Sequence, residues 1–154
     1  MTLIAYANDS GGYALHLSDA EREAPVGWVE GRGVGFRGFD SQGDAARAAY
    51  VAYEAVARWL ARERLLAEPW PDAADLDATA DGPLLWLEAS GVRVGRIVPP
   101  SEIDGEGTHA FELLLPPRVG GATGLNAALV IHRALRSRCA TPAQGGPRWR
   151  CSAS

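Results

Sequence analysis

Residues 48–55 read AAYVAYEA, and residues 127–134 read AALVIHRA. The two segments lie 79 positions apart and are identical at four of their eight positions. Ala, Leu, Arg and Glu are frequent around the first segment and Ala, Leu and Arg around the second, and these residues favour the α-helix. Two similar helical segments, each preceded by strand-like runs, predict a tandem duplication of one structural unit.

The first helix is expected to begin after Ser41 and to end near residue 66. Ser41 is suited to cap the helix, and Asp44 follows three residues later, close to the pattern of a capping box. An apolar stripe repeats at intervals of four, three and four residues, and it consists of Ala49, Tyr53, Val56 and Leu60. A second helix is expected from Thr123 to about Arg136.

Strand-like sequence precedes each helix. Short apolar or alternating runs, separated by turns rich in Gly, Asn, Asp and Pro, predict strands in both halves. They cover residues 3–7, 13–17 and 28–39 (a strand or a long hairpin arm) in the first half, and residues 84–87, 92–97 and 110–115 in the second. The predicted fold is α+β, a tandem β-β-β-α duplication with antiparallel sheet packed against two helices.

The domain prediction follows from these elements. Residues 1–67 form the first unit, residues 68–82 an acidic linker rich in Pro and Asp, residues 83–138 the second unit, and residues 139–154 a flexible tail with Arg and Cys. A unit of about 65 residues buries little apolar surface. The two units are therefore expected to form one pseudo-symmetric domain, and the alternative is a single α+β domain with an accidental internal similarity.

Charge is distributed unevenly along the 154 residues. The chain has 15 Arg, no Lys and 19 acidic residues, which gives a net charge of −4. Residues 1–68 carry −3, residues 69–117 carry −7, and residues 118–154 carry +6 because they contain six Arg and no acid. Without Lys, Schiff-base catalysis is excluded. The abundance of Ala, Gly, Arg and Pro indicates a GC-rich, bacterial genome.

The two cysteines, Cys139 and Cys151, do not have the spacing of a metal site. They are expected to be free thiols, with a disulfide between them as the alternative, and free thiols place the protein in the reducing cytoplasm. No apolar run reaches the length of a membrane span. The first residues lack the basic flank and long apolar stretch of a secretory signal.

No catalytic motif, metal-binding spacing or cofactor motif is found, so none of these is predicted. Residues 33–38 formally fit GxGxxG, but no helix opens on these glycines as a pyrophosphate site requires, so a distorted strand is expected. A ligand pocket between the two units is an alternative, since ligand sites combine apolar walls with a few polar groups. Its lining would come from Trp28, Tyr53, Trp86 and His132.

The C-terminal end offers a candidate nucleic-acid contact. Guanidinium groups can bind phosphates, and an indole between them can stack on a base. The residues concerned are Arg133, Arg136, Arg138, Arg148, Trp149 and Arg150. The alternative is that the helical arginines complement the helix dipole and the rest is a flexible tail.

Asp9, Gly11, Gly12 and Tyr13, followed by residues 38–41 and an Ala-rich helix, form a pattern that covers about residues 3–63. This pattern resembles HicB-type antitoxins. The resemblance implies a compact, partial RNase H-like unit of three strands and a helix. It also implies a non-catalytic module that binds another protein, such as an RNA-acting toxin, through a sheet edge or an acidic surface.

The expected function is that of a small cytosolic, non-catalytic binding protein, antitoxin-like in character. Its partner would be another protein, or a second copy joined through a sheet edge, because exposed strand edges pair readily. A small-molecule-binding protein or enzyme with a pocket between the units is one alternative. Weak nucleic-acid binding by the Arg-rich end is another, and no membrane partner is expected.

Overall fold

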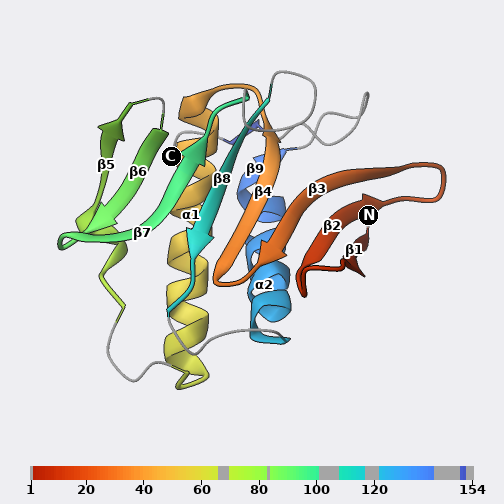
Figure 1. Ribbon diagram of the computed structural model, residues 1–154, viewed down its shortest axis with the longest axis horizontal. Coiled ribbons are helices and arrows are strands. Elements are labelled where there is room, and N and C mark those ends of the chain that lie inside the picture. The colour runs from red at the N-terminus through yellow and green to blue at the C-terminus, as the bar shows by residue number, and fades with distance from the viewer. Residues whose placement is uncertain are drawn as a thin grey trace.

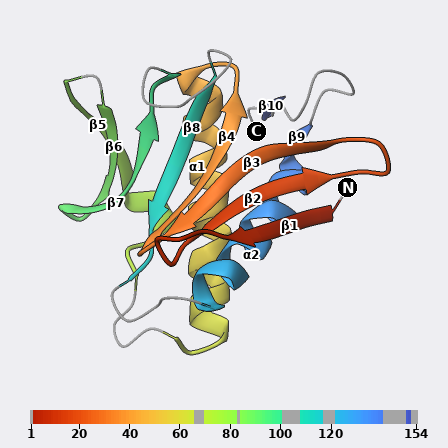
Figure 2. The same ribbon diagram turned by 45° about the vertical axis from the view of Figure 1, so that its right-hand side comes forward.

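The computed structural model describes residues 2–65, 70–82, 84–100, 108–116, 122–140 and 150–151. Eight strands form one antiparallel sheet, and two long helices lie against one of its faces (Figures 1 and 2). The α+β class and the packing of antiparallel sheet against two helices are therefore confirmed. The elements are β1 (Thr2–Ala7), β2 (Tyr13–Ser18), β3 (Glu23–Glu30), β4 (Gly33–Phe39), α1 (Gln42–Arg62), the short 3₁₀ helix η1 (Ala73–Asp75), β5 (Leu76–Asp81), β6 (Leu84–Ala89), β7 (Val92–Val98), β8 (His109–Leu114), α2 (Ala122–Arg138), β9 (Cys139–Ala140) and β10 (Arg150–Cys151).

The order of the strands in the sheet is β1-β2-β3-β4-β8-β7-β6-β5. Each half is a meander of four neighbouring strands followed by a helix, and the last strands of the two meanders, β4 and β8, pair at the centre. Phe36 of β4 lies directly opposite Phe111 of β8. The two helices run in opposite directions behind the central strands (Figure 1). The strand order is therefore symmetric about the central pair β4 and β8.

Each half contains one strand more than the sequence predicted. Residues 28–39 were expected to be one strand or hairpin arm, but the chain turns at Gly31, whose φ is +55°, and divides this stretch between β3 and β4. Residues 76–81 were expected in the linker, but they form the edge strand β5 along β6. The linker prediction is wrong for these residues. Every second residue of β5 points to the same face, and these residues are Asp77, Thr79 and Asp81. This exposed edge strand therefore has the polar composition of a loop.

The two helices bury corresponding positions. The buried residues of α1 are Ala45, Ala48, Ala49, Ala52, Tyr53, Val56 and Leu60. The positions 79 residues later are also buried, and they are Gly124, Ala127, Ala128, Ile131, His132, Leu135 and Cys139. The exposed apolar residues Tyr50 and Leu129 correspond in the same way. This match supports the predicted duplication, which stays a prediction.

The core lies between the sheet and the helices. Phe111 is fully buried at the centre, with its ring 6.1 Å from that of Phe36 and 5.6 Å from that of Phe39. Tyr53 of α1 and Ile131 of α2 are likewise buried from the helical side. No described element covers the opposite face of the sheet, which is called the open face below.

The C-terminal region differs from the expected flexible tail with free thiols. Cys139–Ala140 and Arg150–Cys151 pair as the short strands β9 and β10, with the backbone of Cys139 opposite that of Cys151. Cys139 is disulfide-bonded, so the prediction of free thiols is wrong. The expected cytoplasmic location rested on reduced thiols, and it loses that support.

Candidate functional site

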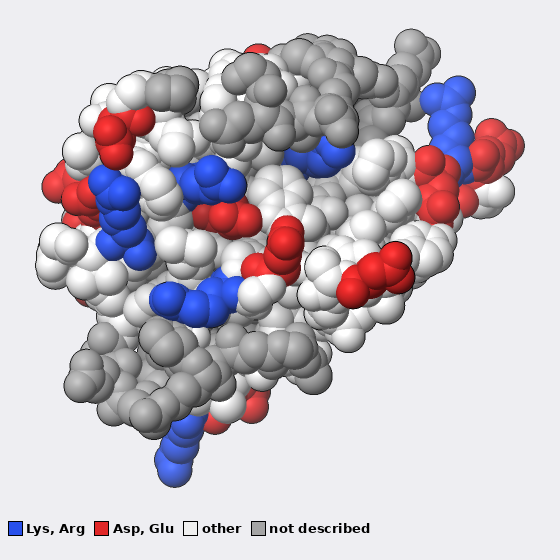
Figure 3. All heavy atoms as spheres, viewed as in Figure 1, with Lys and Arg blue, Asp and Glu red and all other residues white. Residues whose placement is uncertain are grey.

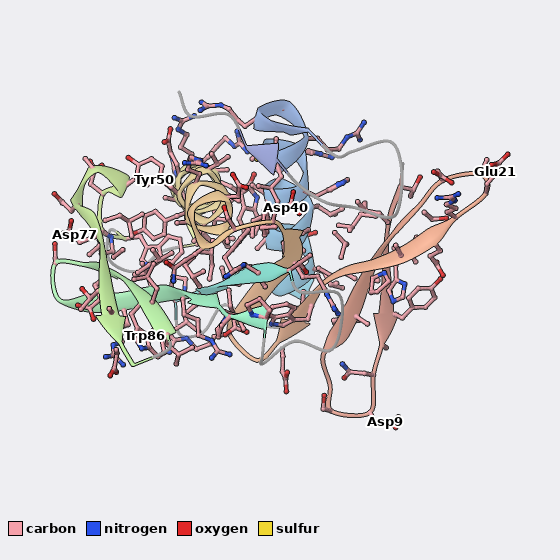
Figure 4. The ribbon with its side chains drawn as sticks, turned by 90° about the horizontal axis from the view of Figure 1, so that it is seen from above. Asp9, Glu21, Asp40, Tyr50, Asp77 and Trp86 are labelled. Atoms are coloured by element: carbon pink, nitrogen blue, oxygen red, sulfur yellow. The ribbon has the colours of Figure 1, made fainter. Side chains whose placement is uncertain are left out.

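The four residues of the predicted pocket do not come together. Tyr53 and His132 lie in the helix–sheet core, whereas Trp28 and Trp86 lie on the open face. Figure 4 shows this division from above, with Tyr50 of α1 on one side of the sheet and Trp86 on the other. The sheet therefore separates the two tryptophans from the tyrosine and the histidine, and the pocket prediction is wrong.

Tyr53 anchors the segment that leads from α1 into β5. Its hydroxyl donates a hydrogen bond to the carbonyl oxygen of Pro71, and its ring stacks on Trp70 at a centroid distance of 4.5 Å. Burial, with smaller contributions from the charges of Asp72 and Asp75, raises the pKa of Tyr53 to about 12. The tyrosine is thus neutral at ordinary pH and has a structural position.

His132 occupies the position of α2 that corresponds to Tyr53 in α1. It is 5% exposed. Burial, followed by the positive charge of Arg136 one turn later, lowers the pKa of His132 to about 4. Its imidazole is therefore uncharged near neutral pH, and it is a core residue.

A single register row crosses the open face from one edge of the sheet to the other. Each member is the cross-strand partner of the next, from β1 to β5 in sheet order: Tyr6, Ala14, Trp28, Gly35, Glu112, Arg96, Trp86 and Thr79. Directly opposite residues have side chains close enough to interact. The row therefore brings together two tryptophans, a carboxylate and a guanidinium from distant parts of the chain.

Glu112 is the centre of this row. Its carboxylate accepts a hydrogen bond of 2.6 Å from the indole Nε1 of Trp28 and one of 3.2 Å from Nε of Arg96. The indole lies over Gly35, where a Cβ atom would be 2.2 Å from a ring carbon. The absence of a side chain at residue 35 therefore lets Trp28 lie flat on β4 and reach Glu112.

We expect Glu112→Ala to lower the free energy of unfolding by about 2 kcal/mol, because it leaves a half-buried indole N–H without its acceptor and removes the ion pair of Glu112 with Arg96 at 3.2 Å. Urea unfolding would measure the loss. Glu88→Ala is the matched control on the same face, since Glu88 pairs with the exposed Arg93 at 3.3 Å. An exposed pair of that kind contributes less than about 1 kcal/mol. Equal losses in the two variants would contradict a central role for Glu112.

Trp86 and Arg93 form a second contact on the open face. The guanidinium carbon of Arg93 lies 4.3 Å from the indole centroid, a cation–π arrangement. Arg93 also pairs with Asp81 at 3.4 Å and with Glu88 at 3.3 Å. Figure 3 shows acidic and arginine side chains interspersed over this face. Its charges neutralise one another locally, which does not suit a polyanion.

The two edges of the sheet differ in charge. β5 carries Asp77 and Asp81, both exposed. β1, with the sequence TLIAYA, carries no charge, and four of its six residues are exposed. Charged side chains on an edge strand are a common protection against unwanted pairing. β5 has this protection and β1 lacks it, although both pair with only one described neighbour.

Of the predicted nucleic-acid contacts, Arg133, Arg136 and Arg138 are exposed on α2. Arg148 and Trp149 lie outside the described residues, and Arg150 is described only through its backbone in β10. The structure therefore places the three helical arginines on one helix but does not test whether the others join them. Among the described residues, no group of three or more His, Cys, Asp or Glu side chains could hold a metal ion.

Sequence reasoning missed Glu112, the residue that links Trp28 and Arg96 on the open face. Glu112 is the only charged residue in the apolar run 110–115, and a lone charge in such a strand is a signal for a partner across the sheet. No helix of the described chain is long and apolar enough to cross a membrane. A scan against protein-family models and searches of curated proteins and solved structures find no match to the chain.

Proposed function

We propose that this protein is a non-catalytic binding module that takes an extended segment of another protein onto the free edge of β1. The observation that carries the proposal is the difference between the two edges. β1 is uncharged and exposed, whereas β5 is guarded by Asp77 and Asp81. Of the two described edges of the eight-stranded sheet, β1 is therefore the one suited to accept another strand.

The chemistry of an edge strand defines its ligand. The outer side of β1 presents backbone N–H and C=O groups in alternation, and an extended polypeptide presents the complementary groups. Alternate side chains of the bound strand would then face the helix side and the open face. The resemblance of residues 3–63 to HicB-type antitoxins agrees with this proposal, because it implies a module that binds a protein through a sheet edge or an acidic surface.

The test introduces into β1 the protection that β5 already has. Ala5 lies on the helix side of β1, opposite Leu15, and Ala78 lies on the helix side of β5, opposite Leu87. Both alanines are exposed. Ala5→Asp is the test variant, and Ala78→Asp is the matched control because it makes the same change on the other edge.

The probe is an array of octapeptides that alternate Val or Ile with Thr, Gln or Glu, combined with hydrogen exchange of the protein. We expect peptide binding to slow the exchange of amides in β1 and to be reduced at least tenfold by Ala5→Asp but not by Ala78→Asp. Thermal melts of both variants would show that they remain folded. Absence of protection in β1 with every peptide, or equal binding by the two variants, would overturn the proposal.

A further inference from the structure

We infer that the segment bound at β1 is acidic, and that Arg133 and Arg136 of α2 recognise its carboxylates. The inference rests on the proposed strand addition and adds the chemistry of the partner. It follows from the charge of these arginines and from their position beside β1. The chemistry of the alternative ligands then decides between them.

The arginines of α2 are uncompensated. Arg133 and Arg136 are exposed, their side chains make no hydrogen bond or ion pair with the described residues, and the sequence of α2 contains no acidic residue. The corresponding surface of α1 is balanced, because Arg47 pairs with Asp44 at 2.8 Å and Arg58 pairs with Glu54. The two helices bury corresponding positions but differ in exposed charge, because α1 carries the acidic residues Asp44 and Glu54 beside its arginines and α2 carries no acidic residue.

The position of α2 places these groups next to the free edge. α2 lies alongside β1 and contacts it (Figure 2). In α1, Tyr53 faces Trp70 and Pro71, on the flank that leads to β5. In the symmetric strand order β1 takes the place of β5, and His132 lies at the position of α2 that corresponds to Tyr53, so we place His132 on the flank of α2 that leads to β1. Leu129 and Arg136 lie on the same flank, one turn on either side of His132, and Arg133 is next to it.

The exposed Leu129 completes this surface. Its side chain is 42% exposed, and it lies one turn before Arg133. A strand added to β1 would direct alternate side chains toward α2, where an apolar residue could cover Leu129 and acidic residues could reach the two guanidinium groups. Arginine binds carboxylates in a bidentate geometry, which adds specificity to the charge attraction.

Charge and hydrogen-bond chemistry argue against the other occupants. A second copy paired through β1 would bring its own α2 arginines toward Arg133 and Arg136, and like charges would repel. A nucleic acid could pair with the arginines, but its phosphodiester backbone has no donors for the carbonyl groups of β1. An acidic peptide satisfies both the edge and the arginines.

The experiment compares octapeptides that differ only in Glu against Gln at alternate positions. Affinity is measured for the wild-type protein, for the Arg133→Gln/Arg136→Gln variant, and for the control Arg47→Gln/Arg58→Gln, which removes two arginines from α1. We expect the Glu peptides to bind the wild type and the control about tenfold more tightly than the Gln peptides, a preference that weakens with salt. The α2 variant should bind both kinds equally.

The other outcomes distinguish strand addition at β1 from the preference for an acidic segment. If Glu and Gln peptides protect β1 equally in all proteins, the acidic preference is overturned and strand addition stands. If no peptide protects β1, both are overturned. If a single-stranded oligonucleotide binds through Arg133 and Arg136 while the Glu peptides show no preference, the surface is a nucleic-acid contact. Protection of β1 that rises with protein concentration without peptide would assign the edge to a second copy.

Discussion

Phe111→Ala is expected to lower the free energy of unfolding by about 3–5 kcal/mol, which is the range found for removing a large buried aromatic ring. Phe111 is fully buried in β8 and contacts the rings of Phe36 and Phe39. It stands at the junction of the two halves, so the cavity would open where the four-stranded meanders meet. The total free energy of unfolding of a small domain is about 5–15 kcal/mol. The variant should therefore be close to unfolded.

Urea unfolding followed by tryptophan fluorescence measures this loss. Leu129→Ala is the control, because it also shortens an apolar side chain but at a position that is 42% exposed. A surface change of that kind alters stability by about 0.5 kcal/mol or less. A loss below about 1 kcal/mol for Phe111→Ala would mean that the halves do not share one core at the β4–β8 junction.

Acidification is expected to destabilise the protein through His132. Its pKa is about 4 in the folded protein, against an ordinary value of 6.5, because it is buried and close to Arg136. The unfolded chain therefore binds a proton more readily than the folded chain, and unfolding takes up a proton as the pH falls. The contribution of neutral His132 to the free energy of unfolding is fully present above pH 6.5. It is lost as the pH falls from 6.5 to about 4, and the loss amounts to about 3 kcal/mol.

The measurement is the free energy of unfolding at pH 7 and at pH 4 for the wild type and for His132→Gln. The variant keeps a polar side chain of similar size but cannot titrate, so the difference between the two proteins isolates the histidine from the carboxylates. We expect the wild type to lose about 3 kcal/mol more than the variant over this range. Parallel pH profiles would show that His132 is accessible to protons in the folded state.

The helices were predictable because their signals are local. Ser41 accepts a hydrogen bond of 3.0 Å from the amide of Asp44, as the cap pattern predicted. Ala49, Tyr53, Val56 and Leu60 are all buried, as their spacing required. The four identical positions between residues 48–55 and 127–134 also predicted an offset of 79 residues. At this offset the buried positions of the two helices match. Each of these features depends on residues within a few turns of one another.

The candidate site was much less predictable. Trp28, Tyr53, Trp86 and His132 were grouped because aromatic and polar residues often line pockets, but the sheet divides them into two pairs. The face to which a strand residue points depends on register and bulges, such as the irregularity between Leu87 and Glu88. At the centre of the sheet, register is set by the pairing of β4 with β8, two strands that are distant in sequence. Glu112 and its partner Trp28 are 84 residues apart, so no local pattern links them.

The sequence by itself determined where the two helices lie, which of their residues are buried, where most of the strands lie, and how charge is divided along the chain. These properties follow from periodicity, capping and composition, which act over short stretches of chain. The tertiary structure alone decided that β4 and β8 meet at the centre and that β1 and β5 become the edges. Strand pairing is a long-range choice governed by the packing of both helices on one face. The uncharged segment Thr2–Ala7 therefore became a candidate binding edge only through its place in the sheet.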